Sequence, residues 1–82
     1  MSKQEKLKVR LLSRPKDFTW NELQSFLRAL GFEEFKGSGS RRKFFRGADK
    51  VLINLHEPHP DKVIKQVYIK QVVEKLIESG DL

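Results

Sequence analysis

The sequence predicts an α+β fold in which helices cover one face of a three-stranded antiparallel sheet. Apolar residues recur at helical spacing in residues 19–30 and again in residues 67–79. Between these stretches, residues 32–56 form three short segments separated by turn-forming residues, which favours an antiparallel meander. The chain has 82 residues and is 38% apolar, so we expect a single domain with one core over residues 1–82.

The first predicted helix covers residues 3–13. Leu7, Leu11 and Leu12 lie at helical spacing there, and Pro15 disfavours helical geometry at the residue before it. Residues 1–16 contain six basic residues and one acidic residue, which gives a net charge of +5. We therefore expect a basic N-terminal helix over residues 1–16, attached to a core over residues 17–80.

The second predicted helix begins at Thr19. Thr19 and Glu22 have the spacing of a capping box, in which each side chain accepts a hydrogen bond from the other residue's backbone N–H. Gly31 stands where a left-handed cap residue is expected. The apolar stripe consists of Trp20, Leu23, Phe26, Leu27 and Leu30. Core packing is the role expected of the aromatic residues Phe18, Trp20, Phe26 and Phe32.

The predicted strands are residues 32–36, 41–46 and 50–56, with turns at 37–40 (Gly-Ser-Gly-Ser) and 47–49 (Gly-Ala-Asp). In the third strand, alternation directs Val51, Ile53 and Leu55 toward the core. Asn54 and His56 therefore share the other face, with His56 near its edge.

Two adjacent aromatic residues, Phe44 and Phe45, lie in the second predicted strand and must point to opposite faces. One belongs to the core. The other is left to stack on a base or to contact a partner protein, and the pattern does not distinguish which is which.

The last predicted helix covers residues 67–79 and stops at Gly80. Its apolar stripe consists of Ile69, Val72, Val73, Leu76 and Ile77. The element order is thus ααβββα. Without the first helix, this is the layout of a double-stranded RNA-binding domain, with both helices on one sheet face and the other face open.

The net charge of +6 and the pI near 9.8 favour anionic partners, with nucleic acid first among them. Residues 36–50 contain six basic residues and one acidic residue, a net charge of +5. Because this segment is folded, its charges should hold fixed positions suited to phosphate contacts. The alternative is a solvated strand face. The basic residues are Lys36, Arg41, Arg42, Lys43, Arg46 and Lys50.

Composition also excludes several classes of protein. The chain has no cysteine, which excludes disulfides, thiolate chemistry, iron–sulfur clusters and finger-type zinc sites. The longest apolar run is three residues, and the N-terminal residues lack the apolar stretch of a signal peptide. We expect a cytoplasmic protein with no membrane segment.

The chain has two histidines, both in the segment His-Glu-Pro-His-Pro at residues 56–60. Only Glu57 and Asp61 are nearby as further ligands, so we expect no metal. Imidazole, with an ordinary pKa of about 6.5, suits RNA cleavage, in which it takes a proton from a ribose 2′-OH or protonates the leaving 5′-oxygen. In the purely structural interpretation, His59 fixes a proline turn and His56 is an exposed strand residue.

The turn at residues 37–40 ends in Ser40 and is flanked by basic residues. Its backbone N–H groups are candidates to hold a phosphate. An ordinary hairpin loop is the simpler interpretation, since the spacing does not match a Walker loop.

Five segments of the sequence together indicate a family resemblance: Thr-Trp-Asn-Glu-Leu at 19–23, Leu-Gly-Phe at 30–32, Gly-Ser-Arg-Arg-Lys-Phe at 39–44, His-Glu-Pro-His-Pro at 56–60 and the closing helix. Over about residues 7–80 the chain resembles the HicA toxins of bacterial type II toxin–antitoxin systems. The resemblance implies cleavage of mRNA and neutralisation by a HicB-type antitoxin. Many HicA proteins have their catalytic histidine where this chain has Arg41, and a guanidinium cannot serve as a general base.

We therefore expect an mRNA-cleaving endoribonuclease toxin that uses no metal or cofactor, with His59 or His56 as general base or acid. Its expected partners are mRNA and a HicB-type antitoxin. Two alternatives remain: a non-catalytic RNA-binding module of the same fold, and an open basic face that mainly receives an acidic antitoxin. The residues expected to contact phosphate are Lys36, Ser40, Arg41, Arg42, Lys43 and Arg46.

Overall fold

The structure is a computed structural model that describes residues 2–59 and 61–82. The elements follow one another in the predicted order of two helices, three strands and one helix. They are α1 (Lys3–Leu12), α2 (Trp20–Ala29), β1 (Glu33–Lys36), β2 (Arg41–Arg46), β3 (Val51–His56) and α3 (Gln66–Glu78).

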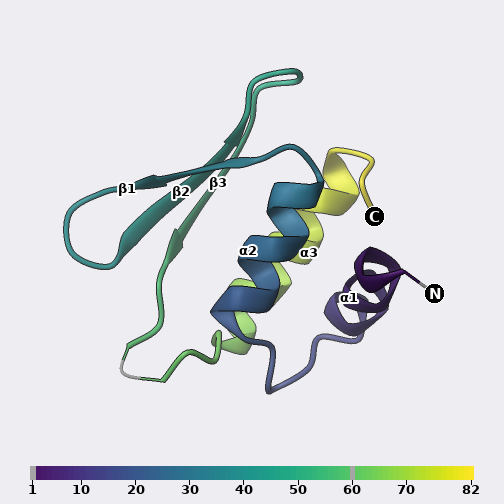
Figure 1. The fold of residues 1–82 in the computed structure, drawn as a ribbon, viewed down its shortest axis with the longest axis horizontal. Coiled ribbons are helices and arrows are strands. Elements are labelled where there is room, and N and C mark those ends of the chain that lie inside the picture. The colour runs from purple at the N-terminus through teal and green to yellow at the C-terminus, as the bar shows by residue number, and fades with distance from the viewer. Residues whose placement is uncertain (1, 60) are drawn as a thin grey trace.

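The elements form three layers, which Figure 1 shows nearly edge-on. The strands pair in the order β1-β2-β3, and both pairs are antiparallel. Helices α2 and α3 cover one face of this sheet, and α1 packs against them on the side away from the strands. The predicted α+β layout, with one sheet face left open, is confirmed.

One apolar core lies between the sheet and the helices and extends to α1. The four aromatic residues predicted for the core, Phe18, Trp20, Phe26 and Phe32, are all buried. The remaining buried positions come from all three helices, the last two strands and Ile64: Leu7, Leu11, Leu23, Leu27, Phe44, Ile53, Leu55, Ile64, Ile69, Val72, Val73 and Leu76. Burial of each such side chain stabilises the fold by about 1.5–3 kcal/mol.

Two apolar side chains predicted to face the core point to solvent instead. Leu12 is 44% exposed and Ile77 is 52% exposed. Each directly follows a buried leucine, and one residue corresponds to about 100° of rotation around a helix. The buried stripes are therefore narrower than the sequence indicated.

The beginning of the sheet differs slightly from the prediction because Phe32 belongs to the capping turn that follows α2. Its backbone N–H donates to the Leu27 carbonyl at 3.0 Å, and the Gly31 N–H donates to the Arg28 carbonyl at 3.0 Å. Gly31 has φ of +95°, as expected for a left-handed cap residue. Pairing therefore begins at Glu33. In the same way β3 begins at Val51, because Lys50 still belongs to the turn, with φ of +58°.

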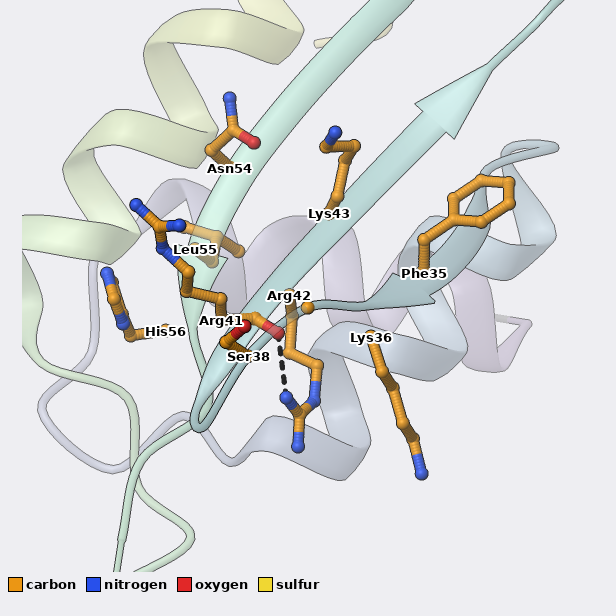
Figure 2. A pocket seen from close by; sticks show the side chains of 10 residues that line it. Phe35, Lys36, Ser38, Arg41, Arg42, Lys43, Asn54, Leu55 and His56 are labelled. Carbon is orange, nitrogen blue, oxygen red and sulfur yellow. Dashed lines mark hydrogen bonds between the residues drawn. The ribbon is translucent and has the colours of Figure 1, made fainter.

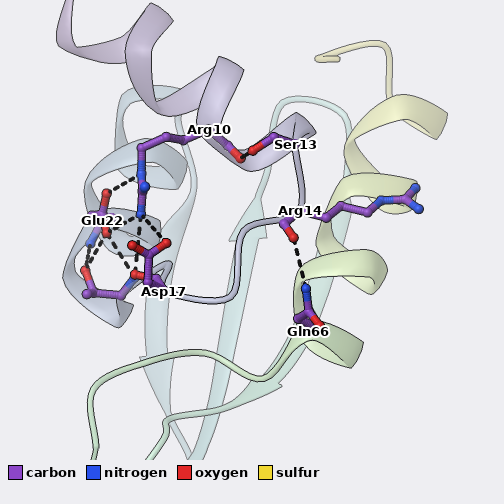
Figure 3. A network of polar contacts seen from close by, with 7 residues as sticks. Arg10, Ser13, Arg14, Asp17, Glu22 and Gln66 are labelled. Atoms are coloured by element: carbon purple, nitrogen blue, oxygen red, sulfur yellow. Dashed lines mark hydrogen bonds and ion pairs between the residues drawn. The ribbon is translucent and has the colours of Figure 1, made fainter.

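Glu22 both caps the N-terminus of α2 and pairs with a residue of α1 (Figure 3). The predicted capping box is present: Thr19 Oγ1 accepts from the Glu22 N–H at 3.2 Å, and Glu22 Oε1 accepts from the Thr19 N–H at 3.0 Å. Arg10 of α1 donates to Glu22 Oε2 at 3.0 Å. Burial by itself would raise the pKa of Glu22, but the hydrogen bonds from Thr19 and Arg10 lower it below its ordinary value.

Candidate functional site

The pleat of β2 divides its basic residues between two environments. Arg41, Lys43 and Phe45 alternate with Arg42, Phe44 and Arg46 along the strand. Phe44 is 2% exposed and lies in the core, so the set that contains it faces the helices. The other set lies on the open face, which also assigns Phe45 to that face.

Arg42, one of the residues predicted to contact phosphate, is occupied by partners within the protein. Its side chain is 13% exposed, and its Nε donates to Glu57 Oε1 at 3.2 Å and lies 4.0 Å from Glu34 Oε2. Its Nη1 donates to the carbonyl of Gly39 at 2.9 Å. Figure 2 shows Arg42 pointing away from Lys43. Because its guanidinium is held by these partners, we leave Arg42 out of the proposed phosphate contacts.

Arg46, also predicted to contact phosphate, is likewise bonded within the protein, where it joins the ends of several elements. Its guanidinium makes a bidentate pair with Asp81 at 2.7 and 2.9 Å and donates to Asp49 at 2.7 Å. It also donates to the Leu30 carbonyl at 3.0 Å and lies 4.7 Å from the centre of the Phe32 ring. Because its guanidinium is held by these partners, we leave Arg46 out of the proposed phosphate contacts.

The open face contains a concavity of about 620 Å³ near the end of β3. Arg41, Lys43 and His56 line it from two strands, and the pairing register places Arg41 directly opposite His56. Figure 2 shows the side chains of Arg41 and Lys43 on this face, whereas Lys36 extends away from them at the far edge. Two of the predicted basic residues are thus brought together beside a histidine.

A second concavity, of about 210 Å³, contains both histidines. His56 and His59 line it together with Ser40 and Tyr68. Ser40 Oγ lies 3.1 Å from His56 Nδ1, so this hydrogen bond orients the imidazole. The ring of Tyr68 is centred 6.4 Å from that of His56. Because His56 also lines the larger concavity, it lies where the two meet.

The segment that carries the histidines is fixed by Glu57. The Glu57 N–H donates to the Ser40 carbonyl at 2.8 Å, and its carboxylate accepts from Arg42 at 3.2 Å and from Lys62 at 3.3 Å. Burial would raise the pKa of Glu57, but Lys62 and Arg42 together lower it below its ordinary value. Arg42 therefore positions the histidine segment through Glu57.

The turn at residues 37–40 is a hairpin closed by its own backbone. The Gly37 N–H donates to the Arg41 carbonyl at 2.9 Å, and the Arg41 N–H donates to the Ser38 carbonyl at 3.2 Å. These two bonds close the turn as a hairpin and occupy the N–H groups of Gly37 and Arg41. Ser40 instead serves the site through its hydroxyl group.

Two further properties describe the site and the chain around it. Within residues 2–59 and 61–82, no group of three or more histidine and carboxylate side chains is arranged to hold a metal ion. Across the same residues, no helix has the length and apolarity that crossing a membrane requires.

Tyr68 and Phe35 were not among the residues predicted for the site. Tyr68 is near the start of α3, and only the tertiary fold brings it beside His56. Phe35 is 47% exposed on β1 and lines the larger concavity. The sequence could have indicated Phe35 through the alternation of side chains along a strand. Glu34 faces the helices, so its neighbour Phe35 faces the open side of the sheet.

Comparison with known proteins bears on what the site does. Neither a search of curated proteins nor a search of solved structures returned a significant match. A family model described as "HicA toxin of bacterial toxin-antitoxin" matches residues 20–78, which run from the first residue of α2 to the last residue of α3. This range includes both histidines and the whole sheet. The chain therefore belongs to the HicA toxin family of bacterial toxin–antitoxin systems.

Proposed function

We propose that this HicA-family toxin binds mRNA and cleaves it by attack of a ribose 2′-OH on the adjacent phosphate. The observation that supports this proposal is the presence of two histidines in one concavity of about 210 Å³, next to Arg41. A pair of imidazoles supplies both the base and the acid that this reaction needs near neutral pH.

The proposed reaction transfers two protons, forms one bond to phosphorus and breaks another. One histidine takes the proton from the 2′-OH, and the 2′-oxygen forms a bond to phosphorus. The bond from phosphorus to the 5′-oxygen breaks, and the second histidine gives its proton to that oxygen. The products are a 2′,3′-cyclic phosphate and a free 5′-hydroxyl.

Arg41 and Lys43 are assigned to the phosphate. Negative charge accumulates on the phosphate oxygens in the transition state, and fixed cations beside them lower the barrier. A guanidinium is a permanent cation, so Arg41 acts as a charge rather than a base. Ser40 orients His56, and Tyr68 packs beside the same ring.

The cleavage test compares the intact chain with His56→Ala, His59→Ala and the double variant on a mixed-sequence single-stranded RNA. Loss of one acid or base is expected to slow cleavage by about 10²–10⁴-fold. We expect products with cyclic phosphate ends and unchanged cleavage in the presence of a chelator. An RNA with 2′-deoxy sugars should remain intact. Full activity in the double variant would contradict the mechanism.

A second candidate function is RNA binding without cleavage. It is favoured by Arg41, which provides charge at a position where many family members have a histidine. In this case the double histidine variant would bind RNA as the intact chain does, and neither would cut it. Electrophoresis of the RNA after incubation separates the two functions.

The proposed partner is a HicB-type antitoxin, and the proposed location is the cytoplasm, where mRNA is found. Induction of the chain in a bacterial host should arrest growth, and co-expression of the antitoxin should relieve the arrest. The double histidine variant tests whether the arrest depends on cleavage, provided that it accumulates to the same level.

A further inference from the structure

We propose that Phe35 forms a stacking platform for an unpaired base, so that the open sheet face holds single-stranded RNA with its phosphates over Arg41 and Lys43. This inference rests on the proposed function, because it describes how the RNA reaches the histidines. It adds a base-binding subsite on β1, outside the catalytic group.

The register of the sheet places this subsite within reach of the histidines. Phe35 pairs with Lys43, and Lys43 pairs with Asn54, so these three residues form one row across the sheet. His56 is two residues further along β3 and pairs with Arg41. From ordinary strand spacing and rise, the Cα atoms of Phe35 and His56 are about 12 Å apart.

The side chains in this row suit a nucleotide chain. Phe35 is 47% exposed, and Figure 2 shows its ring and the Lys43 ammonium on the same side of the strands. The concavity of about 620 Å³ extends from Phe35 to His56, with Lys43 and Arg41 between them. An exposed aromatic ring next to a line of cations is the arrangement by which proteins hold single strands.

The same features disfavour a duplex. In double-stranded RNA the bases are stacked inside the helix and have no free face for an aromatic ring. A duplex would leave the exposed Phe35 ring against sugars and phosphates. The fold is similar to that of double-stranded RNA-binding domains, but the chemistry of this face favours unpaired bases.

RNA is also a better fit than a protein partner for this part of the face. Two cations line the concavity on one side of the aromatic ring, and Asn54 adds an amide that can hydrogen-bond to a base edge. Lysine is depleted at the centre of protein–protein interfaces, whereas Lys43 lies directly beside the Phe35 ring. The charge of the face therefore favours a polyanion with flat rings.

The test measures binding of short single strands whose sugars are 2′-O-methylated, since these strands have no 2′-OH and cannot be cleaved. We expect Phe35→Ala to weaken binding about tenfold. We expect Phe35→Trp to retain binding, with quenching of the introduced indole when the strand binds. Trp20 is 2% exposed and provides a constant background. The control is Ile77→Ala, at an exposed apolar position on α3.

A second comparison separates stacking from other effects of the substitution. A strand of the same length with abasic sugars has phosphates but no bases, so Phe35→Ala should not change its affinity. An equal loss on both strands, or tighter binding of a duplex than of the single strand, would overturn the platform. So would a Phe35→Ala variant that loses antitoxin affinity but binds RNA normally.

The outcome of this binding test does not depend on whether the protein cleaves RNA. A chain that binds single strands through Phe35 but cuts no RNA would refute the mechanism and retain the platform. A chain that cuts RNA equally well with alanine at this position would retain the mechanism and refute the platform.

Discussion

Arg41 and Arg42 are neighbours in the sequence but have different roles. Arg41 lies on the open face opposite His56, whereas Arg42 is 13% exposed and pairs with Glu57. The basic segment could be predicted from the sequence, but its cations were expected to form one surface, and they lie on two sides of the strand. Which cations remain available depends on carboxylates that are distant in the chain, and composition does not reveal those partners.

Substitution of the two arginines by glutamine should therefore affect different properties: RNA binding for Arg41 and stability for Arg42. We expect Arg41→Gln to weaken RNA binding without lowering the melting temperature. Arg42→Gln should lower the free energy of unfolding by about 1.5–3 kcal/mol, because it removes the charged hydrogen-bond donor that Glu57 and Glu34 share and leaves them only the more exposed Lys62 and Arg28. Urea unfolding and RNA binding measured on the same preparations check both expectations. Equal stability of the two variants would contradict the assignment.

Asp81 makes part of the stability depend on pH. Hydrogen bonds from Arg46 lower the pKa of Asp81 below its ordinary value. Because the folded-state pKa is lower than the unfolded one, this stabilisation is complete above the unfolded-state pKa of about 3.9. It is lost as the pH falls through the folded-state pKa.

We accordingly expect the difference in unfolding free energy between the intact chain and Asp81→Asn to be largest near neutral pH and to shrink below about pH 4. Urea unfolding from pH 7 to pH 2.5 measures it. A difference that stays constant over this range would show that Asp81 is not ionised in the pair.

At the scale of elements, the sequence predicted order and type well, because helical spacing and turn residues are local signals. It predicted the boundaries of elements less well where a residue lies in the turn between a helix and a strand. Phe32 closes α2 with a hydrogen bond to Leu27 instead of starting a strand. The apolar side of α1 was predicted from Leu7 and Leu11, which are buried, but its ion pair from Arg10 to Glu22 was not predictable, because it joins residues of two different helices.

The contact between α1 and α2 can be measured by a double-mutant cycle on Arg10 and Glu22. We expect Glu22→Ala to lower the unfolding free energy by about 1–2 kcal/mol, because the α2 cap is lost as well as the ion pair. Arg10→Ala should cost less, about 0.2–1 kcal/mol, because its side chain is 39% exposed. The exposed Lys8→Ala on the same helix is the control. Strict additivity of the two substitutions would show that the pair is not coupled.

At the scale of the whole molecule, the two basic segments of the sequence lie on opposite sides. The cations of α1 are separated from the open sheet face by α2 and α3, as Figure 1 shows. Only the second segment, through Arg41 and Lys43, reaches the face where RNA is proposed to bind. The net charge therefore overstates the charge available to RNA.

The salt dependence of RNA binding tests this arrangement. For a single strand, each phosphate contact contributes about 0.7 to the slope of log affinity against log salt. We expect Lys43→Gln to reduce that slope by about this amount. Lys6→Gln removes the same charge from α1 and should leave the slope unchanged. Equal reductions in the two variants would place RNA contacts on both sides of the molecule.

The two-residue repeat of β2 also affects how the protein tolerates mutation. Arg42, Phe44 and Arg46 serve the fold, whereas Arg41 and Lys43 serve the proposed site. Substitutions that change RNA affinity and substitutions that change stability therefore fall on alternate codons of one short segment. Selection could adjust toxicity in small steps at the odd-numbered positions without risking the folded state, and a survey of all substitutions along this strand would show tolerance that alternates residue by residue.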